Sequence, residues 1–309
     1  MNIGVALPAG DTGQDTKNVV DELVIQAGEA IGAGLSSVWF SQLFEHDAIT
    51  LAALAGRELP EIEVGTAVVP LYPRHPLLLA SQAQTAQAAT GGRFTLGVGL
   101  GVRSLLEPAY GFEYPPPILY LREALTVLRQ VLVGERPDFD GETLTACPPL
   151  PTAVAGGGDI PLIVAAMGPQ ALRVAGELAD GTLTYLAGPR ALSTHIVPIL
   201  TRAAASAGRP APRVIAAVPA VVTDDVETVR QIMAVHLGFY GSIPSYRRML
   251  DLESVSHPVE LALIGSEQEV ESGIRRYFDA GATDVVLIQS GVRSSRERLR
   301  TWQLAGSVC

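Results

Sequence analysis

The sequence predicts an α/β fold, specifically a (β/α)8 TIM barrel with insertions. Eight short runs of β-branched or aliphatic residues recur along the chain, and longer amphipathic stretches separate them. Parallel strands need such helical crossovers, and eight strand–helix units in 309 residues fit a closed barrel. A doubly wound open sheet is the alternative, because periodicity does not show closure. We expect a single domain that covers residues 1–309.

The expected strands are short and apolar, and the expected helices have one apolar face. The strands cover residues 3–7, 37–40, 63–69, 94–98, 162–165, 182–186, 214–218 and 284–288. The helices lie near residues 17–33, 46–57, 76–90, 118–133, 169–179, 189–207, 224–240, 267–280 and 294–305. Ser266 and Glu269 have the spacing of a capping box, and Thr223 or Asp224 is placed to cap the helix after it.

Two segments exceed a minimal barrel. Residues 134–160 predict a hairpin followed by a glycine-rich loop, and residues 238–258 predict an insertion after the seventh strand and its helix. Loops that follow the strands form the active site in such barrels. The segment 238–258 is therefore a candidate substrate lid.

Composition and charge exclude several classes of protein. The 22 basic and 32 acidic residues give a net charge of −10, which disfavours a nucleic-acid or anionic membrane partner. The chain has no basic leader followed by an apolar run and no apolar stretch of membrane-spanning length, so we expect a cytoplasmic protein. Cys147 and Cys309 do not make a disulfide framework, and the five histidines never pair at i, i+4, so we expect no metal site.

Most signatures of catalysis are absent from the sequence. It contains neither a G-x-S-x-G elbow nor a G-x-x-x-x-G-K-[ST] phosphate loop. Gly97, Gly99 and Gly101 follow the fourth strand, but a dinucleotide fingerprint needs a glycine where Val102 stands. A Rossmann site is therefore not expected.

Three loops at successive strand ends carry unusual glycine and proline. They are residues 65–76, 97–101 and 165–181. In the second loop, glycines let the backbone approach a flat ligand. In the third, Gly168 and Pro169 start a helix whose free N–H groups can bind a phosphate without a basic side chain. Together the loops predict one phosphate-bearing planar cofactor, although ordinary packing explains each loop taken alone.

Residues 37–50, 64–101 and 164–190 resemble the bacterial-luciferase-like superfamily of flavin- or F420-dependent oxidoreductases. Within it, the chain is most similar to coenzyme F420-associated oxidoreductases whose substrates are often unassigned. The resemblance implies a TIM barrel with insertions and hydride transfer between the deazaflavin and a small-molecule substrate. It also implies a homodimer, which superfamily relatives commonly form through barrel helices.

The resemblance assigns cofactor contacts position by position. A non-prolyl cis peptide bond between Ala67 and Val68 is expected against the ring face opposite the substrate. The loop along the ring and ribityl chain matches Gly99, Leu100 and Gly101. The loop that receives the phosphate matches Met167, Gly168, Pro169 and Gln170. Ordinary strand packing for Ala67 and Val68, and a tight turn for the glycines, are the alternatives.

The chain also departs from the superfamily pattern. Sugar-phosphate dehydrogenases of this superfamily have an Asp–His pair after the second strand and a Glu after the glycine loop. Gln42, Leu43 and Val102 occupy those positions here, so sugar-phosphate oxidation is not expected. Gln42 remains a candidate to hydrogen-bond the ring carbonyl or the substrate, and Asp47 is expected in the first turn of a helix.

Gln42, His236 and Tyr240 are the candidate catalytic residues. Solvent, Tyr240 or Tyr246 is expected to supply the proton when an activated C=C or C=N bond is reduced. Phe239 is interpreted as core packing, which is also the alternative for Tyr240 and His236, and a structural role is the alternative for Gln42. Arg74 and His75 are candidates to contact anionic groups of the cofactor or substrate, and a surface ion pair is the alternative for Arg74.

Four functions remain open at this point. The first is an F420-dependent oxidoreductase, and the second is an FMN-dependent monooxygenase that activates oxygen at the flavin. The third is a non-catalytic F420- or flavin-binding protein, which the missing Asp, His and Glu favour. The last is a barrel that has lost cofactor binding and serves in an assembly. The sequence names neither the substrate nor the direction of hydride transfer.

Overall fold

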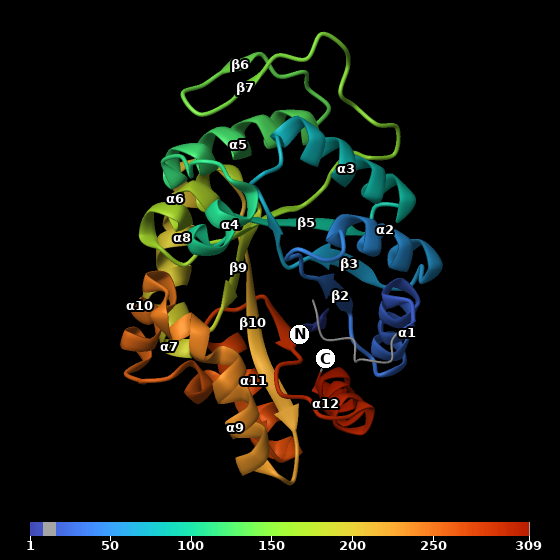
Figure 1. Cartoon of the computed structure of the whole chain (residues 1–309), viewed down its shortest axis with the longest axis vertical. Coiled ribbons are helices and arrows are strands. Elements are labelled where there is room, and N and C mark those ends of the chain that lie inside the picture. Colours follow the sequence, from blue (N-terminus) through green and yellow to red (C-terminus); the bar gives the residue numbers. More distant parts are fainter. Residues whose placement is uncertain (9–16, 309) are drawn as a thin grey trace.

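Eight parallel strands form a closed barrel in the computed structural model, which describes residues 1–8 and 17–308 (Figure 1). Each strand pairs in parallel with the next, and the last pairs with the first, for example Ile3 with Val285. The barrel strands, in order around the sheet, are β1 (Asn2–Leu7), β2 (Ser37–Phe40), β3 (Glu63–Thr66), β5 (Phe94–Gly99), β8 (Leu162–Ala165), β9 (Gly181–Tyr185), β10 (Arg213–Val222) and β12 (Asp284–Ile288). The predicted barrel is confirmed, and the open sheet is not.

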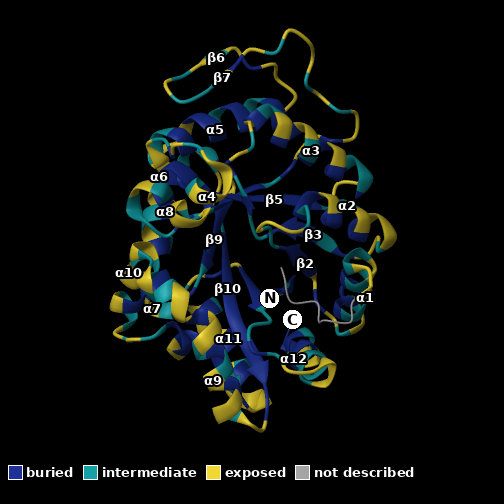
Figure 2. Cartoon of the chain, in the orientation of Figure 1, coloured by how far each residue is buried: buried dark blue, intermediate teal, exposed yellow. Residues whose placement is uncertain are grey.

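Helices surround the barrel, with one side buried and the other exposed (Figure 2). They are α1 (Val19–Gly32), α2 (Ala48–Glu58), α3 (Pro76–Ala89), α5 (Pro117–Leu132), α6 (Pro169–Leu178), α7 (Pro189–Ala191), α8 (Val197–Ser206), α9 (Val226–Leu237), α11 (Glu267–Asp279) and α12 (Ser295–Val308). A π-helical turn, Leu192–Ile196, joins α7 to α8. The capping box of Ser266 and Glu269 is confirmed, but the cap of α9 is Asp225 and not Thr223 or Asp224.

Four elements differ from the predicted ones. The third strand is divided into β3 and β4 (Val69–Pro70) around the Ala67–Val68 bond. Helix α4 (Arg103–Tyr110) was not expected, because it is short, has no side-chain cap and contains a proline. Strand β11 (Leu263–Gly265) is too short to recognise and pairs with the end of β10 that extends beyond the barrel. The helix expected to reach residue 240 ends at residue 237.

The insertion at 134–160 contains the predicted hairpin, formed by β6 (Phe139–Asp140) and β7 (Thr145–Ala146). The carboxylate of Glu123 on α5 accepts hydrogen bonds from the backbone N–H groups of the hairpin turn. The side chain of Gln84 on α3 holds the loop that follows, through the backbone of Thr152 and Val154. The hairpin is thereby attached to the outer helices α3 and α5, and Figure 1 shows it beside α5.

The insertion at 238–258 contains a 3-10 turn, Gly238–Ser242, and helix α10 (Pro244–Glu253). A second 3-10 turn, Pro258–Leu261, leads to β11. The two turns and α9 pack around a small apolar cluster that includes Leu237, Leu250 and Val259. This cluster fixes the insertion beside the end of the barrel where β9 and β10 finish.

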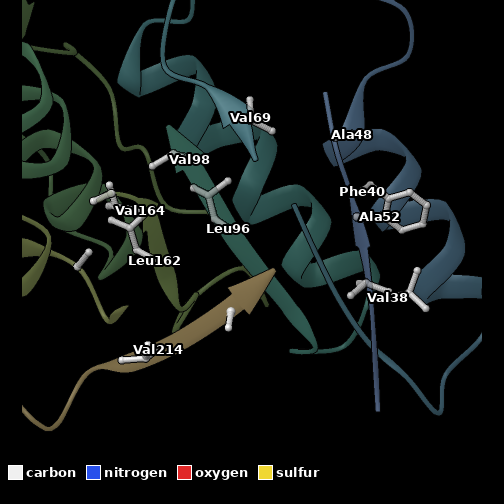
Figure 3. Packing of buried hydrophobic residues seen from close by; sticks show 14 of the residues in the cluster. Val38, Phe40, Ala48, Ala52, Val69, Leu96, Val98, Leu162, Val164 and Val214 are labelled. Carbon is white, nitrogen blue, oxygen red and sulfur yellow. The ribbon is translucent and has the colours of Figure 1, made fainter. Parts of the chain in front are cut away.

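The core has an inner and an outer part. Ala6, Trp39, Leu183, Ile215 and Val286 are among the buried residues that fill the barrel. The larger cluster lies between strands and helices, where Val38 and Phe40 of β2 face Ala48 and Ala52 of α2 (Figure 3). Burial of aliphatic side chains on both faces of the strands is the main stabilising term of such a parallel sheet.

Candidate cofactor and substrate site

A cavity of about 1100 Å³ opens at the carboxyl ends of the barrel strands. Because all eight strands are parallel, the loops after them meet at this one rim. The insertion 238–258 contributes one wall of the cavity, including Phe239, Tyr240 and Tyr246. Among the residues that the structure describes, it is the cavity that gathers nearly all the residues predicted for the site.

Ala67 and Val68 lie on the cavity wall, joined by the predicted non-prolyl cis bond. The hydroxyl of Ser41 donates to the carbonyl oxygen of Ala67 at 2.8 Å, and the N–H of Ala67 donates to Phe40 at 2.8 Å. Ala67 and Val68 are half-buried, in contrast to the fully buried strand residues before them. The bond therefore presents an apolar surface to the cavity.

The glycine loop after β5 also lines the cavity. A β-carbon on Gly99 would stand 2.9 Å from a methyl carbon of Val68, so only glycine lets the two strand ends approach this closely. Gly101 has a φ of +78°, which a residue with a side chain adopts at a cost. The loop is a tight turn, which was the alternative interpretation of these glycines, and it also lines the cavity.

The start of α6 forms another part of the wall. Gly168 is the N-cap and Pro169 is the first helical residue, as predicted. A β-carbon on Gly168 would meet nothing within 4 Å, so the helix start faces open space. Met167, Gly168 and Ala171 line the cavity, whereas Pro169 and Gln170 do not.

Gln42 has a structural contact as well as a place in the cavity. Its side-chain oxygen accepts a hydrogen bond at 3.1 Å from the N–H of Ala48, the first residue of α2. Its NH₂ group has no hydrogen-bond partner within residues 1–8 and 17–308. Gln42 is therefore oriented by the helix start with donor groups still available.

Asp47, Arg74 and His75 have structural roles and do not line the cavity. Asp47 is the N-cap of α2, one position before the first turn expected for it, and it forms an ion pair with Arg74 at 2.8 Å. His75 is the N-cap of α3 and its Nε2 lies 2.9 Å from the carbonyl oxygen of Thr145. The interpretation of Arg74 and His75 as ligand contacts is thus not supported. The ion-pair alternative for Arg74 is confirmed, and the pair is partly buried rather than on the surface.

Three tyrosines form an aromatic wall of the cavity. Tyr185 of β9 packs edge-to-face against Tyr240 and Tyr246, with ring centroids 5.2 and 6.2 Å apart. Burial raises the pKa of all three tyrosines, so their hydroxyls stay protonated near neutral pH. His236 of α9 lines the same region, and Phe239 is 47% exposed there, so its interpretation as core packing is wrong.

Fixed charge is scarce in the described part of the lining. Arg103 and Glu107 on α4 form an ion pair at 2.9 Å, and no other Asp, Glu, Lys or Arg belongs to the described part of the cavity lining.

No group of three His, Cys, Asp or Glu within the described ranges could hold a metal ion. No helix in this part of the chain is long and apolar enough to cross a membrane. Cys309 lies outside the described residues.

Three residues that support the site escaped the sequence reasoning. Tyr185 belongs to no motif, although it lies in the predicted strand 182–186 and ends the observed strand β9. Tyr114 donates to the carbonyl oxygen of Leu100 at 2.8 Å, and Nε2 of His195 lies 3.0 Å from the carbonyl oxygen of Met167. Both hold backbone atoms of cavity loops from outside the cavity, and only the fold brings them there.

The chain is similar to proteins of known family and fold. A model of the luciferase-like monooxygenase family matches residues 1–284. A putative coenzyme F420-dependent oxidoreductase of Mycobacterium tuberculosis is 27% identical over 312 residues, covering 92% of this chain and 87% of the relative. An F420-dependent secondary alcohol dehydrogenase, solved with an F420–acetone adduct, is 19% identical with a TM-score of 0.81, covering 100% of this chain and 98% of that chain. The oxygenating component of a Baeyer–Villiger monooxygenase of Pseudomonas putida, solved with FMN, is 18% identical with a TM-score of 0.77, covering 99% and 97%.

Proposed function

Because the chain belongs to the luciferase-like monooxygenase family, we propose that it is a coenzyme F420-dependent oxidoreductase that transfers a hydride between the deazaflavin and a small organic substrate. One observation carries the proposal: a single cavity joins the Ala67–Val68 bond, the glycine loop after β5 and the start of α6. The name of the Mycobacterium tuberculosis relative supports F420 as the cofactor.

The residues of the cavity fit each part of this cofactor. Ligand pockets typically have volumes of about 300–1,000 Å³, so a cavity of about 1100 Å³ has room for the cofactor and a substrate. Ala67 and Val68 would support the ring, and the backbone of Gly99, Leu100 and Gly101 would follow the ribityl chain. The free N–H groups beside Gly168 would hold the phosphate in the open space there. When bound, F420 supplies or accepts a hydride at C5 of its ring.

The chain itself would orient the ring and the substrate and donate a proton to the substrate. A C=C or C=N bond that gains a hydride at one atom gains a proton at the other, so reduction needs one donor. Tyr240 and Tyr246 remain protonated at neutral pH and line the cavity, and His236 lies beside them. We assign the proton to this group and the orientation of ring or substrate to the NH₂ group of Gln42.

The scarcity of carboxylates argues against sugar phosphates as substrates. Gln42, Leu43 and Val102 line the cavity where superfamily sugar-phosphate dehydrogenases have Asp, His and Glu. A hydroxyl oxidation needs a base to accept the proton, and none of these side chains provides one. Reduction of an activated double bond places fewer demands on the protein, and we propose it as the direction of the reaction.

An FMN-dependent monooxygenase is the second candidate. The Pseudomonas putida structure with FMN supports it, because that protein shares the barrel fold. Both cofactors carry a tricyclic ring and a phosphate, so the same cavity features suit either. A cofactor-binding protein without turnover is a third candidate, since Gln42, Leu43 and Val102 stand where the superfamily dehydrogenases have Asp, His and Glu.

We also propose that the chain is a homodimer, as the family resemblance implies, and that it is located in the cytoplasm, as the sequence predicts. Sedimentation velocity of the purified protein measures the oligomeric state, and fractionation of the host cells measures the location. A monomer across micromolar concentrations would reject the dimer.

Equilibrium titration of the cofactor-free protein with F420, and separately with FMN, tests the function. We expect micromolar or tighter F420 binding and weaker FMN binding, followed by cofactor fluorescence. The opposite preference would favour the monooxygenase, and oxygen consumption would be the next assay. Binding of neither cofactor would reject the enzyme function.

A matched pair of variants tests the phosphate position. Gly168→Glu should abolish cofactor binding, because its carboxylate would occupy the open space at the start of α6. Gly158→Glu adds the same charge in another open position, outside the cavity lining, and should leave binding unchanged. Equal affinity of Gly168→Glu and the wild type would show that the phosphate lies elsewhere.

A further inference from the structure

We infer that His195 is a positioning residue that turns the N–H of Gly168 toward the cavity and thereby sets the affinity for a phosphate-bearing cofactor. The inference rests on the proposed function of the cavity. His195 belongs to the π-helical turn Leu192–Ile196, in the crossover after β9. It does not line the cavity, so it is not a direct ligand contact.

The ring of His195 holds one carbonyl group of the loop after β8. Its Nε2 lies 3.0 Å from the carbonyl oxygen of Met167. A carbonyl oxygen only accepts hydrogen bonds, so Nε2 carries the hydrogen and donates. Because Met167 lines the cavity and His195 does not, this carbonyl points out of the cavity toward the crossover.

The geometry of the peptide bond then fixes the next N–H group. The cis bonds of the described residues are Ala67–Val68 and Tyr72–Pro73, so the bond between Met167 and Gly168 is trans. In a planar trans peptide the N–H points opposite to the carbonyl. The N–H of Gly168 is therefore directed to the cavity side, where a β-carbon on Gly168 would meet nothing within 4 Å.

This N–H joins other free donors at the same place. The first N–H groups of a helix have no partner within it, and here they belong to Gln170 and Ala171, since Pro169 has none. The hydroxyl of Thr182 has one hydrogen to donate and lies 2.8 Å from the carbonyl oxygen of Val164 and 3.1 Å from that of Ala166. The hydrogen bond from His195 therefore fixes the Met167 carbonyl, which leaves the N–H of Gly168 oriented before a ligand arrives.

A loss of affinity that is confined to phosphate-bearing cofactors would distinguish the positioning role of His195 from a merely structural role. We would measure dissociation constants of His195→Ala for two matched pairs, FMN with riboflavin and F420 with its phosphate-free chromophore. Loss of a fixed donor to a charged oxygen should weaken the phosphate-bearing member by about tenfold. The phosphate-free member should change by less than about twofold, because the ring contacts are untouched.

Two further variants complete the test. His195→Gln keeps an N–H donor of similar reach and should recover most of the selectivity. His75→Ala removes a comparable bond, from Nε2 to a backbone carbonyl at 2.9 Å, outside the cavity, and should leave both pairs unchanged. Equal weakening of both members of a pair, or no weakening of either, would overturn the role of His195.

The test also separates this inference from the proposed function. Wild-type protein that binds neither cofactor would reject the proposed function itself. In that case, inorganic phosphate titrated into the cofactor-free protein, with the amide resonance of Gly168 followed by NMR, still tests the donor. A shift in the wild type that is lost in His195→Ala supports the inference, and absence of a shift in the wild type overturns it.

Discussion

The hydroxyl of Tyr114 lies 2.8 Å from the carbonyl oxygen of Leu100 and donates a hydrogen bond to it. Leu100 belongs to the glycine loop and lines the cavity, whereas Tyr114 is buried behind it. The ring of Tyr114 packs against the ring of Tyr72, with centroids 4.7 Å apart. An aromatic cluster outside the cavity thus fixes the loop that we expect to follow the cofactor.

Tyr114→Phe should weaken cofactor binding while the fold is kept. The change removes one hydrogen bond from the loop backbone, which is worth about 1 kcal/mol. We therefore expect a roughly fivefold higher dissociation constant for the bound cofactor. Fluorescence titration measures the affinity, and far-UV circular dichroism checks that the secondary structure is unchanged.

Tyr72→Phe is the matched control for that variant. The hydroxyl of Tyr72 is buried and has no hydrogen-bond partner among the described residues. Its removal leaves the ring packing and relieves an unpaired polar group, so we expect unchanged affinity and equal or higher stability. Equal weakening by Tyr72→Phe and Tyr114→Phe would mean that ring packing, and not the hydroxyl, fixes the loop.

Arg213 holds together the end of the barrel opposite the cavity. Its guanidinium lies 2.8 Å from Glu63 and 2.7 Å from Asp284, and 5.8 Å from the ring of Trp39. Arg213→Ala would leave the buried carboxylate of Asp284 unpaired, so we expect a loss of about 3 kcal/mol in the free energy of unfolding.

Denaturant unfolding measures this loss, and Arg275→Ala is its control. Arg275 forms an exposed i, i+4 pair with Glu271, which is worth about 0.5 kcal/mol or less. Similar losses for the two variants would show that the barrel pair behaves as an ordinary surface pair.

The hydrogen bonds of Glu123 lead us to expect that the attachment of the hairpin to α5 weakens in acid. Burial alone would raise its pKa, but hydrogen bonds from the Thr143 side chain and from the N–H groups of Thr143, Glu142 and Leu144 hold its pKa below the ordinary value. The folded-state pKa lies below the unfolded one, so the stabilisation is complete above about pH 4.3 and is lost as the pH falls through the folded pKa.

Hydrogen exchange of residues 139–146 measures the attachment of the hairpin. We expect Glu123→Gln to raise their exchange at neutral pH, since the neutral amide accepts weaker hydrogen bonds. The core strands β1 and β2 serve as the internal reference. Unchanged exchange in the variant would mean that Gln84 and the apolar contacts suffice to hold the segment.

The barrel was predictable from the sequence because its strands are buried on both faces and read as continuous apolar runs. Signals that act over a few residues, such as the capping box of Ser266 and the start of α6 at Pro169, were also predicted correctly. Helix α4 was missed because it is short, lacks a side-chain cap and contains a proline, and strand β11 because its three residues are defined by their pairing with β10.

The site residues also fall into those that the sequence predicts and those that only the fold brings together. The Ala67–Val68 bond and the glycine loop follow from a resemblance over contiguous residues, and the structure places them in one cavity. The supports of these loops, Tyr114 and His195, lie 14 and 28 residues from the atoms they hold. No local pattern links such positions, and Phe239 was misassigned because an apolar residue in an insertion reads like core.

The half-buried tyrosines of the aromatic wall lead us to expect a particular pH dependence of reduction. Burial raises the pKa of Tyr240 and Tyr246 above the ordinary value of about 10. A tyrosine donor acts while protonated, so kcat/KM should hold as the pH rises to about 10 and fall only above it. Loss of the donor in Tyr246→Phe or Tyr240→Phe should lower kcat by about a hundredfold without changing cofactor affinity. Steady-state oxidation of reduced F420 across this pH range measures both effects; a decline already near neutral pH would instead indicate an imidazole donor.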